Sequence, residues 1–109
     1  EETVLVAPAA GSVGSIAVQI ARAAGALVVG VAAGEQCRYL VDELGCADAI
    51  DHRDIAAGLA RACPDGVSLF IDGVGGAVHD AGVAAMTPRG RVVLIGFISG
   101  YEGGPQPYG

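Results

Sequence analysis

The apolar residues of this chain fall into two kinds of segment, which alternate along the sequence. In the first kind, about five consecutive residues are apolar and several are β-branched, which is typical of strands buried on both faces of a sheet. Pro8 ends the first such segment, because proline cannot donate a hydrogen bond to a neighbouring strand. Segments of this kind predict strands at residues 3–7, 26–31, 49–51, 67–71 and 91–97.

Segments of the second kind have apolar residues at helical spacing. The first of them is apolar around most of its circumference, so it requires cover on more than one side. Gly25 and Gly45 follow the first two, at positions where a left-handed glycine commonly ends a helix, and Asp54 is placed to cap the third. Helices are therefore predicted at residues 12–24, 35–44, 54–62 and 77–86, with turns at 64–66 and 87–90.

The order of these elements predicts the fold class. Strands that are apolar on both faces and alternate with helices form a parallel sheet with helices on both sides. Right-handed crossovers then give a doubly wound α/β fold. A complete dinucleotide-binding sheet of this type has six strands, so we expect the sixth to be missing here. We expect residues 1–100 to form this domain and residues 101–109, rich in glycine and proline, to be a loop tail.

Composition and charge narrow the class of protein. The chain is 52% hydrophobic and 17% charged, as a globular domain is. Polar residues or glycine interrupt every long apolar run, and the acidic Glu1 and Glu2 do not fit a secretory signal. We therefore expect a cytoplasmic protein that does not cross a membrane. The net charge of −6, with scattered arginines and no lysine, disfavours nucleic acid as a partner.

The cysteines favour neither a disulfide framework nor a metal site. Cys37, Cys46 and Cys63 are odd in number, and none of them has C-x-x-C spacing. We expect three free thiols in a reducing compartment and no metal site.

A glycine turn follows the first predicted strand. The segment from Ala9 to Gly14, A-A-G-S-V-G, matches G-x-G-x-x-G except that Ala9 replaces the first glycine. Gly11 lets the main chain approach a diphosphate, Gly14 lets the helix pack on the strand, and the amides from Ser12 and Val13 onward direct positive charge at the phosphates. A merely structural turn is the alternative; the position between a strand and a helix favours dinucleotide binding.

The end of the second strand bears on the choice of nucleotide. A residue that contacts the adenosine ribose is expected about 20 residues after the glycine turn. At Ala33 no acid is present to bind a ribose 2'-hydroxyl, and small residues there leave room for the 2'-phosphate of NADP. Arg38 is a candidate for binding that phosphate, and a surface ion pair with Asp42 is the alternative. Glu35 is a further candidate for the ribose if its loop folds back.

Four segments of the sequence resemble one known family. They are A-A-G-S-V-G at 9–14, C-R-Y-L-V-D-E-L-G at 37–45, D-G-V-G-G at 72–76 and I-G-F-I-S-G-Y at 95–101. In this order they resemble the cofactor-binding domain, of the Rossmann type, of zinc-free medium-chain dehydrogenase/reductases, the branch of prostaglandin, leukotriene, curcumin and quinone reductases. The resemblance implies NADP(H) as the cofactor and an enone or quinone as the substrate, with hydride transfer to a C=C bond.

The resemblance also implies roles for residues toward the end of the chain. Phe97, Ile98 and Ser99 match the segment that lines the nicotinamide, and Gly73 and Val74 match one that passes close to it. Tyr101 matches a tyrosine beside the substrate, whose hydroxyl donates to the carbonyl oxygen and steadies the enolate. An ordinary exposed tyrosine is the alternative interpretation of Tyr101.

Three departures from the family pattern concern the cofactor. Gln36 replaces a lysine that binds the 2'-phosphate, His52 replaces a tyrosine after the third strand, and Gly73 replaces an asparagine. The first two leave NADH open as the cofactor. His79 lies on a predicted helix with no partner evident from the sequence, and neither histidine is expected to be a catalytic base.

The implied function belongs to a longer protein. Family members have an N-terminal barrel-like catalytic domain, which this sequence lacks, so we expect the chain alone to bind NADP(H) without turning over an enone. The full-length protein is expected to be able to form a homodimer. Two alternatives remain: an enoyl reductase domain of a multi-enzyme synthase and a non-catalytic NADP(H)-binding module. A methyltransferase is disfavoured because the second strand does not end in an acid.

Overall fold

A computed structural model describes residues 2–95 of the chain. In this part, five strands alternate with four α-helices, and two short 3-10 turns precede α2 and α3. No helix in the described range is long and apolar enough to cross a membrane. In chain order the elements are β1 (Thr3–Ala7), α1 (Ser12–Ala23), β2 (Leu27–Ala32), η1 (Gly34–Gln36), α2 (Cys37–Asp42), β3 (Asp48–Asp51), η2 (His52–Asp54), α3 (Ile55–Ala62), β4 (Val67–Asp72), α4 (Gly76–Ala84) and β5 (Met86–Leu94).

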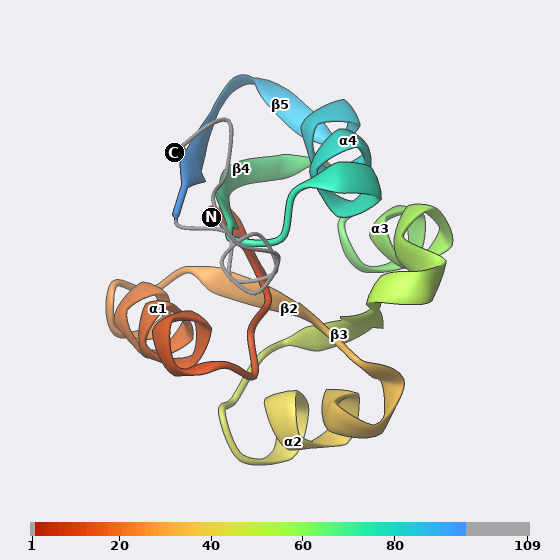
Figure 1. Cartoon of the computed structure of the whole chain (residues 1–109). Helices are drawn as coiled ribbons and strands as arrows, with labels where there is room; N and C mark the ends of the chain where they lie inside the picture. Colours follow the sequence, from red (N-terminus) through yellow and green to blue (C-terminus); the bar gives the residue numbers. More distant parts are fainter. Residues whose placement is uncertain (1, 96–109) are drawn as a thin grey trace, which may run out of the picture.

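The strands form one parallel sheet in the order β3-β2-β1-β4-β5. Helices α1 and α2 lie on one face of the sheet, and α3 and α4 lie on the other (Figure 1). The predicted doubly wound fold is confirmed. From β1 the chain adds β2 and then β3 on one side of that strand, and it then crosses back to add β4 and β5 on the other side. The direction in which strands are added therefore reverses between β1 and β4. In sheets of this kind, ligands bind beyond the carboxyl ends of the strands at that reversal.

The core consists of two apolar layers separated by the sheet. Along β1, Val4 and Val6 pack toward α1 and α2, while Leu5 and Ala7 belong to the layer beneath α3 and α4. All four side chains are at most 2% exposed. This explains why the first strand is apolar throughout: it is the central strand and is covered on both faces.

Several element boundaries differ from the sequence prediction. The helix expected at 35–44 is a 3-10 turn followed by α2, and the turn expected at 87–90 is an irregularity within β5, where the register with β4 shifts. Asp54 precedes α3 but its side chain makes no capping hydrogen bond; Asp51 instead accepts one from the amide of Arg53 and caps η2. The predicted tail, 101–109, lies outside the described residues.

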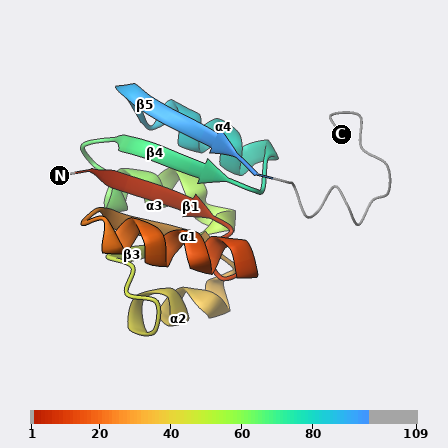
Figure 2. The ribbon, with the colours of Figure 1, turned by 90° about the vertical axis from the view of Figure 1, so that its left-hand side faces the viewer.

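On the sheet face that carries α1, the described residues place no helix over β4 and β5. On α1 the side chains of Val13, Ile16 and Ile20 are 54%, 56% and 65% exposed. Ile20 lines a groove of about 480 Å³, which Leu69 and Ile71 of β4 also line. In Figure 2 α1 lies in front of the lower part of the sheet, and β4 and β5 face the viewer with no helix in front of them.

Candidate functional site

The candidate site lies where the carboxyl ends of β1 and β4 meet. Ala7 and Asp72 are partners in the parallel register, and the amide of Gly73 donates to the carbonyl oxygen of Ala7 at 2.7 Å. On the other side of β1, the amide of Ala9 donates to the carbonyl oxygen of Val31 at 2.9 Å. The turn after β1 is therefore held between its two neighbouring strands at the point where the strand order reverses.

The turn between β1 and α1 presents main-chain amides that no side chain caps. Gly11 is the N-cap of α1 and has no side chain that could make a capping hydrogen bond. The first helical hydrogen bond runs from the amide of Ser15 to the carbonyl oxygen of Gly11 at 2.8 Å. The amides of Ser12, Val13 and Gly14 precede that bond, so they have no acceptor within the helix. A Cβ added at Gly11 would have no atom within 4 Å. This is the arrangement that binds an anionic group at a helix N-terminus.

Gly14 has a packing role in the same turn. It is buried, and a Cβ at this position would overlap the carbonyl oxygen of Pro8. The close approach of α1 to β1 thus requires glycine, as the sequence predicted for helix packing. The structure also accounts for Ala9, which replaces the usual first glycine. Its methyl group is fully buried against Gly30 of β2, where an added Cβ would lie 2.8 Å from it.

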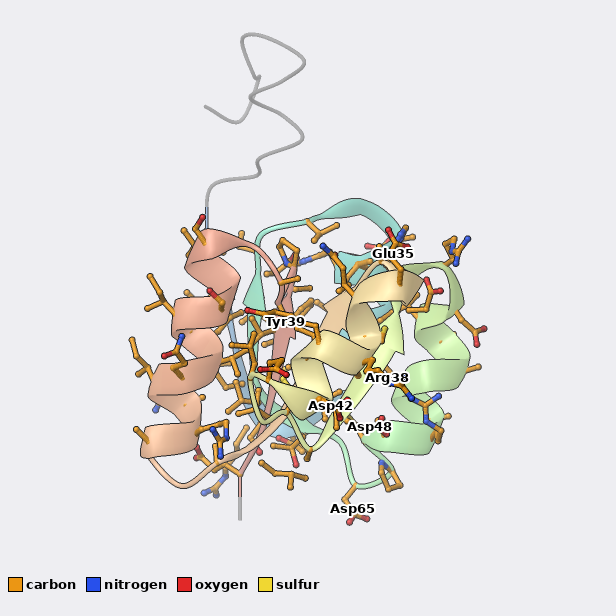
Figure 3. All side chains as sticks on the ribbon, turned by 90° about the horizontal axis from the view of Figure 1, so that it is seen from below. Glu35, Arg38, Tyr39, Asp42, Asp48 and Asp65 are labelled. Atoms are coloured by element: carbon orange, nitrogen blue, oxygen red, sulfur yellow. The ribbon has the colours of Figure 1, made fainter. Side chains whose placement is uncertain are left out.

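The residues predicted near the end of β2 separate into two groups. Ala33 and Gln36 lie at the carboxyl edge, where the amide of Gln36 donates to the carbonyl oxygen of Ala33 at 2.8 Å. Arg38 does not join them. Its Nε atom lies 3.7 Å from Asp42 Oδ2, and its side chain is 90% exposed. In Figure 3 Glu35 marks the start of this helical segment, whereas Arg38 and Asp42 lie farther along it. The structure therefore shows the surface ion pair that was the alternative for Arg38.

One arginine that the sequence did not single out lies at this edge. Arg53 follows β3, and its Nη2 and Nε atoms donate to Asp51 at 2.8 and 3.2 Å. These bonds, with one from the Arg53 amide, lower the pKa of Asp51 to about 2. His52 is exposed between the two. The sequence feature that could have indicated this pair is the D-x-R spacing at the end of the third strand. Its position next to the end of β2 follows only from the pairing of β3 with β2.

The turn between β4 and α4 is organised by a buried carboxylate. Asp72 is fully buried, and its Oδ1 atom accepts hydrogen bonds from the amides of Val74 and Gly75 at 2.9 and 3.0 Å. Its Oδ2 atom lies 2.7 Å from Nδ1 of His79. The expectation that His79 lacks a partner is therefore wrong, because the first turn of α4 places its ring over the end of β4, where it also stacks on Phe70.

Most of the predicted cofactor residues therefore lie at one edge of the sheet. Gly11, Ser12, Val13 and Gly14 form the central turn; Gly73 and Val74 adjoin it beyond β4, and Ala33, Gln36 and His52 lie beyond β2 and β3. Arg38 lies away from this edge. The remaining predicted residues, Phe97, Ile98, Ser99 and Tyr101, lie outside the described residues.

Metal-ligating side chains do not gather in this part of the chain. Within residues 2–95, no group of three or more His, Cys, Asp or Glu side chains is placed to hold a metal ion. Cys37, Cys46 and Cys63 are free thiols. Burial is the main cause that raises the pKa of each thiol, which favours its protonated form.

Comparison with known proteins finds similarity to dehydrogenases and reductases. The family model described as "Zinc-binding dehydrogenase" matches residues 12–107. The NADPH-dependent curcumin reductase of Escherichia coli is 40% identical over 111 residues, covering 99% of this chain and 32% of that protein. Prostaglandin reductase-3 of Mus musculus is 37% identical over 101 residues, covering 91% of this chain and 27% of that protein.

A solved structure extends the likeness to three dimensions. The crystal structure of CurA from Vibrio vulnificus in complex with NADPH has a TM-score of 0.87 and 39% sequence identity, covering 99% of this chain and 33% of that one. The chain thus spans about a third of the length of these relatives.

Proposed function

This chain belongs to the zinc-binding dehydrogenase family, and on that basis we propose that it binds NADPH within an oxidoreductase that reduces the C=C bond of an α,β-unsaturated ketone or a related quinone. One observation carries the proposal: the uncapped amides of the β1–α1 turn lie at the reversal of the strand order. The curcumin reductase relative is NADPH-dependent, and CurA was solved with NADPH, which supports this cofactor.

The residues of the turn fit a diphosphate. The amides of Ser12, Val13 and Gly14 are donors without helical acceptors, and the twelve-residue helix α1 adds the positive end of its dipole. The lack of a side chain at Gly11 lets an anion approach the main chain closely. These features need no charged side chain, so the turn can bind a diphosphate in a chain with net charge −6.

The nicotinamide half of the cofactor is proposed to lie on the β4 side of the turn. There Val74 is half-buried in a loop that Asp72 holds by two hydrogen bonds. NADPH supplies the hydride when bound. By resemblance, Phe97, Ile98 and Ser99 line the nicotinamide ring, and the Tyr101 hydroxyl donates to the carbonyl oxygen of the substrate, which stabilises the charge that develops there.

The roles proposed for residues 2–95 involve no metal ligand. The family description refers to zinc, but the side chains of residues 2–95 do not provide a set of ligands that fits it.

Cofactor binding and turnover are tested separately. Calorimetric titration of the 109-residue chain with NADPH is expected to give one site per chain; absence of binding would contradict the proposal. The chain alone is expected not to oxidise NADPH in the presence of a small enone, because relatives are about three times as long. A full-length protein containing the chain should do so. If the full-length protein binds NADPH but reduces no α,β-unsaturated ketone, quinone or acyl thioester, the non-catalytic alternative is correct. Reduction of acyl thioesters alone would indicate an enoyl reductase.

A further inference from the structure

We propose that Arg53 makes this chain prefer NADPH to NADH by binding the 2'-phosphate of the adenosine ribose, and that Asp51 is the residue that positions it. The inference rests on the proposed function and adds the residue that decides which nucleotide is bound. For Arg38 the sequence left both this role and a surface ion pair with Asp42 open, and the structure shows the ion pair.

Arg53 lies at the carboxyl edge of the sheet, beside the end of β2. Asp51 pairs in register with Ala32, the last residue of β2. The guanidinium of Arg53 then lies against the tip of β2, since its Nη2 atom is 3.1 Å from the position that a Cβ would occupy at Gly34. The tip of the second strand, about 20 residues after the glycine turn, is where nucleotide-binding domains of this fold contact the adenosine ribose.

Asp51 orients the guanidinium of Arg53. Asp51 Oδ1 accepts from Nε of Arg53 at 3.2 Å, and Oδ2 accepts from Nη2 at 2.8 Å. The Arg53 amide also donates to Oδ1 at 3.0 Å. This uses one side of the planar group and leaves the Nη1 donors and the second Nη2 donor free. Since the Arg53 side chain is 73% exposed, those donors are open to a phosphate, which a guanidinium binds with two parallel hydrogen bonds.

Asp51 is also the acid at this edge. An NADH site of this fold uses a free carboxylate to accept a hydrogen bond from the ribose 2'-hydroxyl. Both oxygens of Asp51 already accept hydrogen bonds from Arg53, and these bonds lower the pKa of Asp51 to about 2. The pair packs against Gly34, where an added Cβ would contact Asp51 Oδ2 and Arg53 Nη2. Glu35, on the exposed η1 turn, is the remaining acid nearby.

The test uses two probes that differ only in the 2'-phosphate. The full 109-residue chain is titrated by calorimetry with adenosine 2',5'-diphosphate and with adenosine 5'-monophosphate. The unmodified chain is expected to bind the bisphosphate about tenfold more tightly or better, as charge-assisted hydrogen bonds require. Arg53→Gln should remove that preference and leave the affinity for the monophosphate unchanged. Arg38→Gln, the matched control, should change neither affinity.

A second measurement tests the positioning role. In Asp51→Asn, Arg53 keeps its charge but loses its ionic partner, so the preference for the bisphosphate should fall by a few-fold and remain above that of Arg53→Gln. The pKa of the Asp51 carboxyl, followed by NMR, should rise toward its ordinary value in Arg53→Gln. An unchanged pKa would overturn the Asp51–Arg53 pair.

The outcomes separate this inference from the proposed function. If the unmodified chain binds both probes equally, or if Arg53→Gln keeps the preference, the role of Arg53 is overturned while nucleotide binding stands. A loss of preference in Arg38→Gln but not in Arg53→Gln would return the role to Arg38. If the unmodified chain binds neither these probes nor NADPH, both the inference and the proposed function fail.

Discussion

The turns that follow β1 and β4 are both rich in glycine and lie side by side at one edge of the sheet, yet they are stabilised in opposite ways. After β1, the sequence A-A-G-S-V-G has no charged side chain, and the turn is fixed by main-chain bonds and by the close contact of Gly14 with Pro8. After β4, the sequence D-G-V-G-G is fixed by the Asp72 carboxylate, which accepts hydrogen bonds from two amides of the turn.

The difference shows which turn is available to a ligand. An amide that already donates to a carboxylate of its own chain cannot also donate to a phosphate. In addition, the negative charge of Asp72 repels an anion from the β4–α4 turn. The β1–α1 turn has neither feature, and its amides point outward from the N-terminus of α1 without a capping side chain. Two glycine turns thus differ in what is open to a ligand: the β1–α1 turn keeps its amides uncapped, whereas Asp72 occupies two amides of the β4–α4 turn.

The largest effect on stability is expected from Asp72→Ala. It leaves the amides of Val74 and Gly75 and the ring of His79 without their buried acceptor, which costs roughly 3–5 kcal/mol of the free energy of unfolding. Urea unfolding followed by circular dichroism measures this. Asp72→Asn is the control, because its amide oxygen still accepts from the two amides. If the alanine variant is no less stable than the asparagine variant, the carboxylate does not organise this turn.

The next largest effect is expected from Gly14→Ala. The added methyl group would overlap a main-chain oxygen of Pro8, which cannot rotate away, so α1 must shift from β1 at a cost of about 3 kcal/mol. The same unfolding measurement applies. A loss below about 1 kcal/mol would show that the β1–α1 turn is not held by this close contact.

A smaller effect is expected from His79→Leu. This change removes one hydrogen bond to Asp72 from a side chain that is 36% exposed, and water can partly replace it, so about 1 kcal/mol is expected. NADPH affinity, measured by calorimetry, should change less than two-fold, since the two amide bonds to Asp72 remain. A loss as large as that of Asp72→Ala would place His79, not the carboxylate, at the centre of this turn.

The smallest effect on stability is expected from Gly11→Ala, and it tests the comparison most directly. The residue has a φ of −79°, and an added Cβ meets no atom within 4 Å, so the only expected loss is the roughly 0.5 kcal/mol by which glycine exceeds alanine at a helix N-cap. The methyl group would nevertheless stand between the amides and a phosphate, and NADPH affinity should fall about tenfold or more. Unchanged NADPH affinity in this variant would move the diphosphate away from the β1–α1 turn.

The fold was largely predictable because its signals are local. Continuous apolar strands such as 3–7 and 67–71, and the left-handed glycines at 25, 45 and 66, mark elements whose ends the structure reproduces closely. The errors occurred where neighbours along the chain do not decide the conformation. The segment 87–90 contains a proline and a glycine, as turns do, but its pairing with β4 keeps it within a strand as an irregularity.

The sequence by itself determined the doubly wound sheet and the position of its glycine turn, because periodicity, glycine spacing and strand-to-helix order are properties of consecutive residues. Only the tertiary structure decided which side chains meet. It paired Asp72 with His79, left Arg38 with Asp42, and brought Arg53 beside Gly34. A hydrogen bond acts over about 3 Å, so its partners depend on which strands lie next to each other, and that order is fixed only when the whole sheet has assembled.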